Sequence, residues 1–137
     1  LAAELGLEFR LDRAVRANTR LAHRLIWLAG TDRAPADQAT VNDRLMQAYF
    51  SEGRNLGDPD TLAELVAEVG FDREFVRGWL DTDAGVADVD ADLAAARDYG
   101  ITAVPTFVIN EQWAIPGAQD TETFVAALRR LLARAAT

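Results

Sequence analysis

The sequence predicts a mostly helical α/β protein with a short strand near its start, a helical block and a β-β-α end. Residues 7–11 alternate apolar and polar side chains, which is the period of a half-buried strand. Residues 18–99 repeat apolar side chains at helical spacing between capping residues and glycines. Residues 106–109 and 113–115 are rich in β-branched and aromatic side chains, which favour strands, and a helical apolar stripe follows them.

Composition limits the classes of function. The 137 residues are 50% hydrophobic, which suffices for the core of one domain, and no run approaches the roughly 18 apolar residues of a membrane span. The net charge of −8 repels phosphate backbones and argues against nucleic acid or an anionic membrane as partner. The chain has no cysteine and one histidine, so we expect no disulfide and no thiolate or multi-histidine metal site. We also expect no metal ligands among the other residues and no cofactor.

The first predicted helix begins after Asn18, whose side chain can accept a hydrogen bond from an unpaired amide of the first turn. Leu21 and Leu25 fall on its apolar face. His23 and Trp27 lie on the opposite side, one turn apart, which indicates a second contact surface.

Capping residues also mark the later helices. Thr40 or Asn42 is expected to cap the second helix, and residues 58–60 (Asp-Pro-Asp) mark the start of the third. Asp72 is expected to cap the fourth helix. Asp83 is expected to begin the fifth, which ends before a glycine.

The C-terminal part predicts a hairpin and a last helix. Pro105 cannot donate to a ladder and therefore belongs at a strand start or at an edge, where a trans bond is the general expectation. Residues 110–112 link the two strands as a tight turn, although Glu111 stands where glycine is preferred. Asp120 or Thr121 is expected to cap the final helix.

Four segments in order resemble one known family. They are Asn18-Thr19-Arg20-Leu21-Ala22-His23-Arg24-Leu25, Tyr49-Phe50-Ser51-Glu52-Gly53, Val104-Pro105-Thr106-Phe107-Val108-Ile109-Asn110 and Gly117-Ala118-Gln119. Together they resemble the DsbA-like thioredoxin superfamily, FrnE-type branch, over nearly the whole chain. The resemblance implies a thioredoxin-like portion formed by residues 1–17 and 100–137, with a helical insertion domain over residues 18–99. It also implies a cis bond before Pro105.

The resemblance implies a thiol–disulfide oxidoreductase, of the protein disulfide oxidoreductase or isomerase type. Members carry a Cys-x-x-Cys motif at a helix N-terminus, where the helix dipole lowers the thiol pKa. That unit precedes the region matching Leu1, so we expect the redox cysteines upstream of this chain, which cannot itself exchange thiols. The implied partner is a disulfide-bearing protein or a small thiol, and the implied location is the cytoplasm.

The same resemblance implies where a substrate would bind. The main chain of Val104 would pair with an extended substrate segment, with Pro105 as the wall beside it. Gln119 would stand near a helix N-terminus, where a carboxylate can rest.

Three residues of the first helix region are further candidates. Asn18 and Trp27 are candidate substrate-binding residues, with capping and packing as the respective alternatives. His23 is a candidate general base, although a lone histidine on a helix is more commonly structural or solvated.

Two other functions remain open. Glutathione-dependent isomerases and kappa-type glutathione transferases belong to the same superfamily, and binding of glutathione would distinguish them. A catalytically inert fragment that covers its open sheet edge by forming an oligomer, such as a homodimer, is the non-enzymatic alternative.

Overall fold

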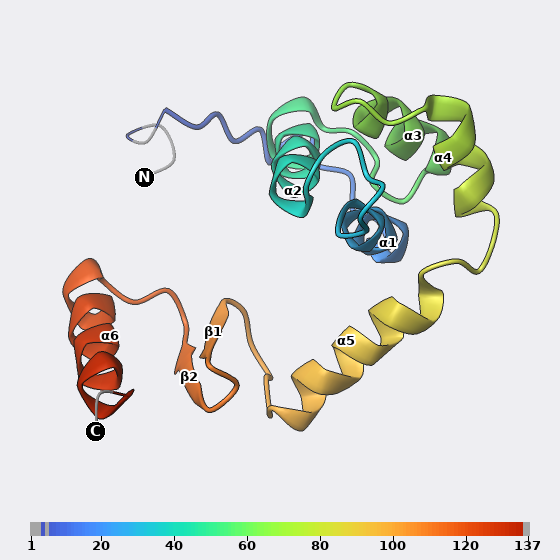
Figure 1. The fold of residues 1–137 in the computed structure, drawn as a ribbon. Helices are drawn as coiled ribbons and strands as arrows, with labels where there is room; N and C mark the ends of the chain where they lie inside the picture. Colours follow the sequence, from blue (N-terminus) through green and yellow to red (C-terminus); the bar gives the residue numbers. More distant parts are fainter. Residues whose placement is uncertain (1–3, 5, 136–137) are drawn as a thin grey trace. The chain divides into compact units, whose positions relative to one another are not determined.

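In the computed structural model, which describes residue 4 and residues 6–135, the chain forms two compact units, Leu1–Leu93 and Ala94–Thr137 (Figure 1). The elements are α1 (Arg20–Ala29), α2 (Gln38–Gln47), the π-helix η2 (Ala48–Glu52), α3 (Pro59–Ala67), α4 (Arg73–Leu80), α5 (Val86–Asp98), β1 (Thr106–Ile109), β2 (Trp113–Pro116) and α6 (Thr121–Ala135). The predicted class, a mostly helical α/β fold, is confirmed. The expected division into residues 1–17 with 100–137 and residues 18–99 stays a prediction.

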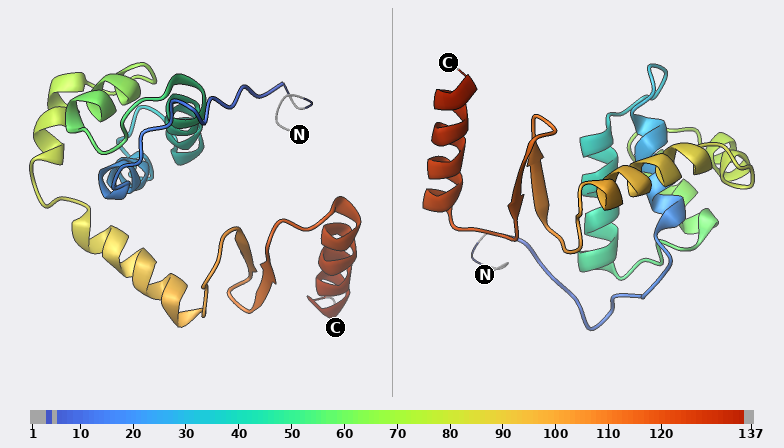
Figure 2. Two further views of the ribbon diagram at one scale, coloured as in Figure 1. Left: turned by 180° about the vertical axis from the view of Figure 1, so that it is seen from behind. Right: turned by 90° about the horizontal axis from the view of Figure 1, so that it is seen from below.

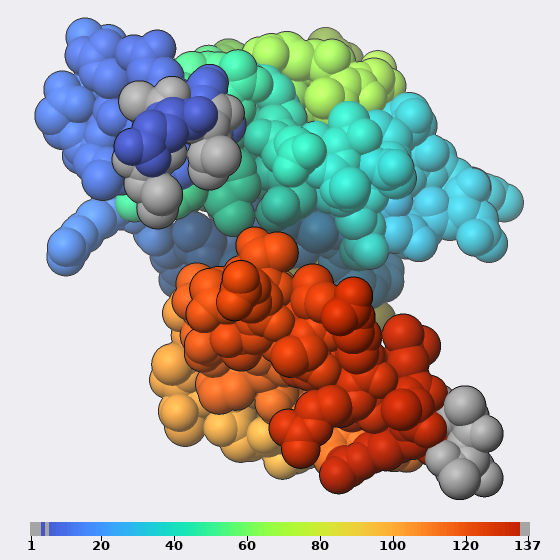
Figure 3. All heavy atoms as spheres, turned by 90° about the vertical axis from the view of Figure 1, so that its left-hand side faces the viewer, coloured from blue at the N-terminus to red at the C-terminus, as the bar shows by residue number. Residues whose placement is uncertain are grey.

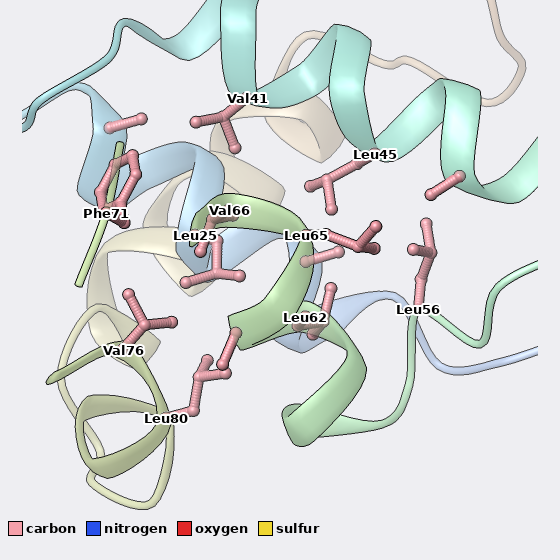
Figure 4. Packing of buried hydrophobic residues seen from close by; sticks show 14 residues of the cluster. Leu25, Val41, Leu45, Leu56, Leu62, Leu65, Val66, Phe71, Val76 and Leu80 are labelled. Atoms are coloured by element: carbon pink, nitrogen blue, oxygen red, sulfur yellow. The ribbon is translucent and has the colours of Figure 1, made fainter. Parts of the chain in front are cut away.

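The core of the first unit is built from apolar side chains of α1 to α4 (Figure 4). Leu25 is 1% exposed, and Val41 and Leu62 are fully buried. Burying a side chain of this size contributes roughly 1.5–3 kcal/mol. Packing of these apolar faces therefore holds the four helices together, because isolated helices of eight to ten residues are marginal in water.

Aspartates begin four of the helices. Asp37, Asp58, Asp72 and Asp120 each accept a hydrogen bond from the main-chain N–H three residues later, at 2.7–2.8 Å. The amide of Thr40 lowers the pKa of Asp37, and the amide of Thr123 lowers that of Asp120. The hydroxyl and then the amide of Thr61 lower the pKa of Asp58. The carboxylates of Asp37, Asp58 and Asp120 are therefore stabilised in their charged form by the helix ends that they cap.

Residues 7–11 are not a strand, which corrects the prediction from their alternating pattern. Within the part of the chain that the structure describes, the single sheet is the β1–β2 pair, so these residues have no ladder to join. They lie instead against the π-helix η2. The Arg10 N–H donates to the Phe50 C=O at 2.6 Å, and the Ser51 hydroxyl donates to the Glu8 C=O at 2.6 Å. Figure 3 shows this segment in blue beside the green-cyan atoms of α2 and η2.

Three predicted helix starts differ from the structure. Asn18 accepts from the Arg20 N–H at 2.9 Å as expected, but the helix begins one residue later than predicted, after Thr19. Neither Thr40 nor Asn42 caps α2, because Asp37 lies further upstream and starts the helix there. Similarly, α5 begins at Val86 and not at Asp83, since a left-handed glycine turn intervenes.

The second unit contains the predicted hairpin followed by α6. The strands are antiparallel, with Thr106 opposite Pro116, and they lie side by side in Figure 2. Residues 110–112 join the two strands. Asn110 and Glu111 adopt positive φ angles of 50° and 56° at the centre of a turn that the Gln112 N–H closes by donating to the Ile109 C=O at 3.2 Å, although neither residue is glycine. The Phe107 ring meets the Phe124 ring of α6 edge to face, with centroids 4.9 Å apart.

Candidate functional site

The open end of the hairpin brings together Val104, Pro105 and Gln119. The Val104–Pro105 peptide bond is cis, and both residues precede β1 directly. The Gly117 N–H donates to the Pro105 C=O at 2.8 Å, which ties the residue after β2 to the residue before β1. This link extends the hairpin by one hydrogen bond beyond the two strands.

The side chain of Val104 is 88% exposed. Its main-chain N–H and C=O have no hydrogen-bond partner among the described residues. A free donor and a free acceptor on one exposed residue beside a strand are the groups with which an extended peptide can pair. The geometry therefore gives Val104 the chemical capacity that the sequence resemblance implies for it.

Gln119 is held at the same end of the hairpin by its own side chain. Its Nε2 donates to the Pro116 C=O at 2.7 Å, and α6 begins two residues later, after Asp120. Asp120 Oδ1 already accepts from the Thr123 N–H at 2.7 Å. A carboxylate ligand would therefore meet a negative cap at this helix start, so Gln119 offers its amide and not an anion site.

The three candidates near α1 have different surroundings. Asn18 accepts from the Arg20 amide, which is the capping alternative. Trp27 is half-buried and packs against Gly85, where an added Cβ would lie 3.0 Å from the indole ring. This close approach supports the packing alternative for Trp27. His23 is exposed, and it is the one of the three that lines a groove.

We call this hollow the His23 groove; its volume is about 330 Å³. It is lined by Thr19, Ala22, His23, Ile26, Asn42, Leu45, Met46, Tyr49, Phe50 and Leu56. Sequence reasoning identified only His23 as a candidate in this set. The α2 and η2 residues were missed because they come about twenty or more positions later in the chain, and no local pattern joins them to α1.

Sequence reasoning also missed Arg24, whose exposed fraction is 3%. Its guanidinium donates to the C=O groups of Thr82 at 2.7 Å, Ala84 at 2.9 Å and Leu80 at 3.2 Å. It therefore binds carbonyls at the C-terminus of α4 and in the following loop. A cation is favourable at a helix C-terminus because the last carbonyls there are unpaired and carry partial negative charge. The sequence signal that could have indicated a buried arginine was the position of Arg24 next to the apolar stripe of α1. Its role is to position α4 and the loop.

Within the described residues, no helix is long and apolar enough to cross a membrane. The contacts and exposed groups described above give two separate candidate sites, one in each unit. They are the Val104 end of the hairpin and the His23 groove.

Comparison with known proteins places the chain among thioredoxin-like proteins. The family profile for the DSBA-like thioredoxin domain matches residues 1–129. The uncharacterized protein YwbO of Bacillus subtilis (strain 168) is 39% identical over 89 residues, which are 64% of this chain and 44% of YwbO.

Solved structures give the same fold. The probable DsbA oxidoreductase SCO1869 from Streptomyces coelicolor is 35% identical, with a TM-score of 0.81 over 94% of this chain and 55% of that chain. A 2-hydroxychromene-2-carboxylate isomerase is 20% identical, with a TM-score of 0.74 over 98% of this chain and 64% of that chain, which is a likeness of fold alone. The chain thus spans about half to two thirds of the length of these proteins.

Proposed function

The chain belongs to the DSBA-like thioredoxin family, and we propose that it forms the substrate-binding part of a thiol–disulfide oxidoreductase. Because the chain has no cysteine, the proposal includes a redox dithiol carried by a segment that precedes Leu1. Family and neighbours are oxidoreductase or isomerase enzymes, which supports an enzyme of this broad class.

The observation that carries the proposal is the free main chain of Val104. An exposed residue with an unpaired N–H and C=O stands at the end of a hairpin in a chain of this family. We propose that a disulfide-bearing peptide binds there as an additional extended strand, beside Pro105 and the amide of Gln119. Main-chain pairing tolerates many sequences, which suits an enzyme that acts on unrelated protein substrates.

The candidates near α1 enter the proposal with different roles. The Asn18 side chain accepts from the Arg20 amide ahead of α1, and Trp27 packs on Gly85, which supports a structural role for each. His23 is not proposed as a general base, because its imidazole has no hydrogen-bond partner among the described residues. Location in the cytoplasm and self-association as a homodimer stay predictions.

The test uses the protein encoded by the whole natural gene. We expect reduction of a protein disulfide such as insulin in the presence of dithiothreitol. Val104→Pro removes the main-chain donor and should lower kcat/KM for a peptide disulfide about tenfold, since one lost hydrogen bond costs roughly 1.4 kcal/mol. The matched variant Val104→Ala keeps the main chain and should stay within about threefold of the parent.

A small aromatic disulfide serves as the second substrate, because it cannot pair as a strand. Its reduction should be unaffected by Val104→Pro, which separates loss of peptide binding from loss of folding. A gene without cysteines ahead of Leu1, or no disulfide reduction by the whole protein, would refute the oxidoreductase. Micromolar binding of glutathione in calorimetry, without disulfide reduction, would favour the glutathione-dependent isomerase or kappa-type transferase instead.

A further inference from the structure

We propose that the His23 groove is a second binding site, for a small aromatic molecule with an anionic, hydrogen-bond-accepting head group. The groove lies wholly in the first unit and uses none of the residues assigned to peptide binding at the hairpin. The inference therefore goes beyond the proposed disulfide chemistry and stands independently of it.

The floor of the groove belongs to the hydrophobic core. Ala22, Leu45 and Leu56 line it and are 4%, 3% and 7% exposed, and all three are members of the buried cluster. A floor made of core side chains is present before any ligand arrives, as in most small-molecule sites. Filling it therefore requires no opening of the fold.

One wall is aromatic and is supported from behind. The Tyr49 and Phe50 rings meet edge to face with centroids 5.0 Å apart, and Phe50 also stacks on Phe9 at 4.7 Å. The π-helix that carries both rings is held against residues 7–11 by a hydrogen bond that the Arg10 N–H donates to the Phe50 C=O. With about 330 Å³ available, near the lower limit of ligand pockets, the groove suits one or two fused rings.

Four polar side chains, which can each donate as well as accept a hydrogen bond, complete the lining. Thr19, His23, Asn42 and Tyr49 each supply a hydrogen-bond donor, and an imidazole keeps at least one N–H in either protonation state. No Asp or Glu is among the ten lining residues, although the chain carries a net charge of −8. Because donors are available to an anion and no carboxylate is present to pair with a cation, the lining favours an acceptor or an anion as the head group.

Acidic side chains occur next to this groove but line a different hollow. Glu8 and Asp43 line a neighbouring hollow of about 700 Å³, together with Gln47, and it shares only Met46 and Phe50 with the His23 groove. Two acidic side chains therefore line the neighbouring hollow, whereas none lines the His23 groove. Residue 47, which lines only the neighbouring hollow, provides a control position for the test.

The chain contains its own reporters. Its 137 residues include one histidine and one methionine, and both His23 and Met46 line the groove, so in the 137-residue chain each gives a single NMR signal that needs no assignment by mutation. We expect titration with 1-naphthylacetate to shift the His23 Hε1 and Met46 methyl signals to saturation with the same Kd. The cationic analogue 1-naphthylmethylamine, which has the same ring system, should bind at least about tenfold more weakly.

Two variants that add the same charge one position apart complete the design. Met46→Glu, at a side chain that is 50% exposed, should weaken 1-naphthylacetate binding at least about tenfold, read at His23. Gln47→Glu should leave the Kd within about twofold. If circular dichroism shows that Met46→Glu is unfolded, Asn42→Asp replaces it. Linear shifts without saturation, different Kd values at the two signals, equal binding of the cation or equal weakening by both variants would overturn the proposal.

Discussion

Replacing Arg24 by methionine tests the central structural inference about the first unit. Methionine keeps an unbranched apolar stem of similar reach but removes all five guanidinium donors. The carbonyls of Leu80, Thr82 and Ala84 then lose the partner that holds the end of α4 and the next loop against α1.

The magnitude follows from the number and length of the hydrogen bonds. Three bonds lie between 2.7 and 3.2 Å, and the fourth, to the Trp79 C=O at 3.4 Å, is too long to add much. At roughly 1–1.5 kcal/mol for each of the three, the free energy of unfolding should fall by about 3–5 kcal/mol. A domain of ordinary stability would then be only marginally folded, because such domains have about 5–15 kcal/mol in total.

Urea denaturation followed by circular dichroism measures the loss. The matched control is Arg20→Met, one turn earlier on α1, because Arg20 forms an exposed ion pair with Asp90. Removing an exposed pair should cost less than about 1 kcal/mol. Arg24→Lys, which keeps the charge on one nitrogen, should fall between the two. An Arg24→Met loss as small as the Arg20→Met loss would refute the inference that Arg24 holds α4 in place.

Two further predictions concern caps and glycines. The lowered pKa of Asp37, Asp58 and Asp120 means that their contribution to stability is present above the ordinary carboxyl pKa of about 4 and is lost as pH falls through the lower folded-state value. The urea midpoint should therefore decline below about pH 4, and Asp58→Asn should decline less steeply; an equal decline in both proteins would contradict this assignment. Gly85→Ala should cost about 2 kcal/mol or more in thermal or urea unfolding, because Gly85 has a φ of +73° and an added Cβ would lie 3.0–3.1 Å from two indole rings. Gly100→Ala, with a φ of +70° and no atom within 4 Å, should cost only about 1 kcal/mol, so equal losses would show that the indole contacts do not matter.

Local signals predicted much of the secondary structure. The Asp58-Pro59 start of α3 and the Asp72 start of α4 are where the sequence placed them, since a cap needs only a side chain and an amide three residues later. The hairpin was also predicted, because β-branched runs on either side of a short link specify it locally. Where local signals competed, as at Asp37 against Thr40 and Asn42, the sequence offered several acceptors and the structure uses the first.

The candidate sites were predicted only in part. Val104, Pro105 and Gln119 were identified together from the family resemblance, and they lie directly before and shortly after one hairpin. The partners of His23 in its groove were missed, since they come from α2, η2 and the connection to α3. The strand predicted over residues 7–11 was wrong for the same reason, because a strand needs a partner and the alternating pattern carries no information about one.

From its order of residues alone, this chain specified where α3, α4 and α6 begin, a hairpin that follows Pro105 and a resemblance to the thioredoxin-like class. These features depend on residues within about four positions of one another or on a recognisable sequence motif. The tertiary structure alone decided that Arg24 binds the end of α4, that Phe50 accepts from Arg10, and that a single histidine and a single methionine share one apolar groove. Such contacts join positions far apart in the chain, and only the packing of the helices determines which of many chemically suitable partners meet.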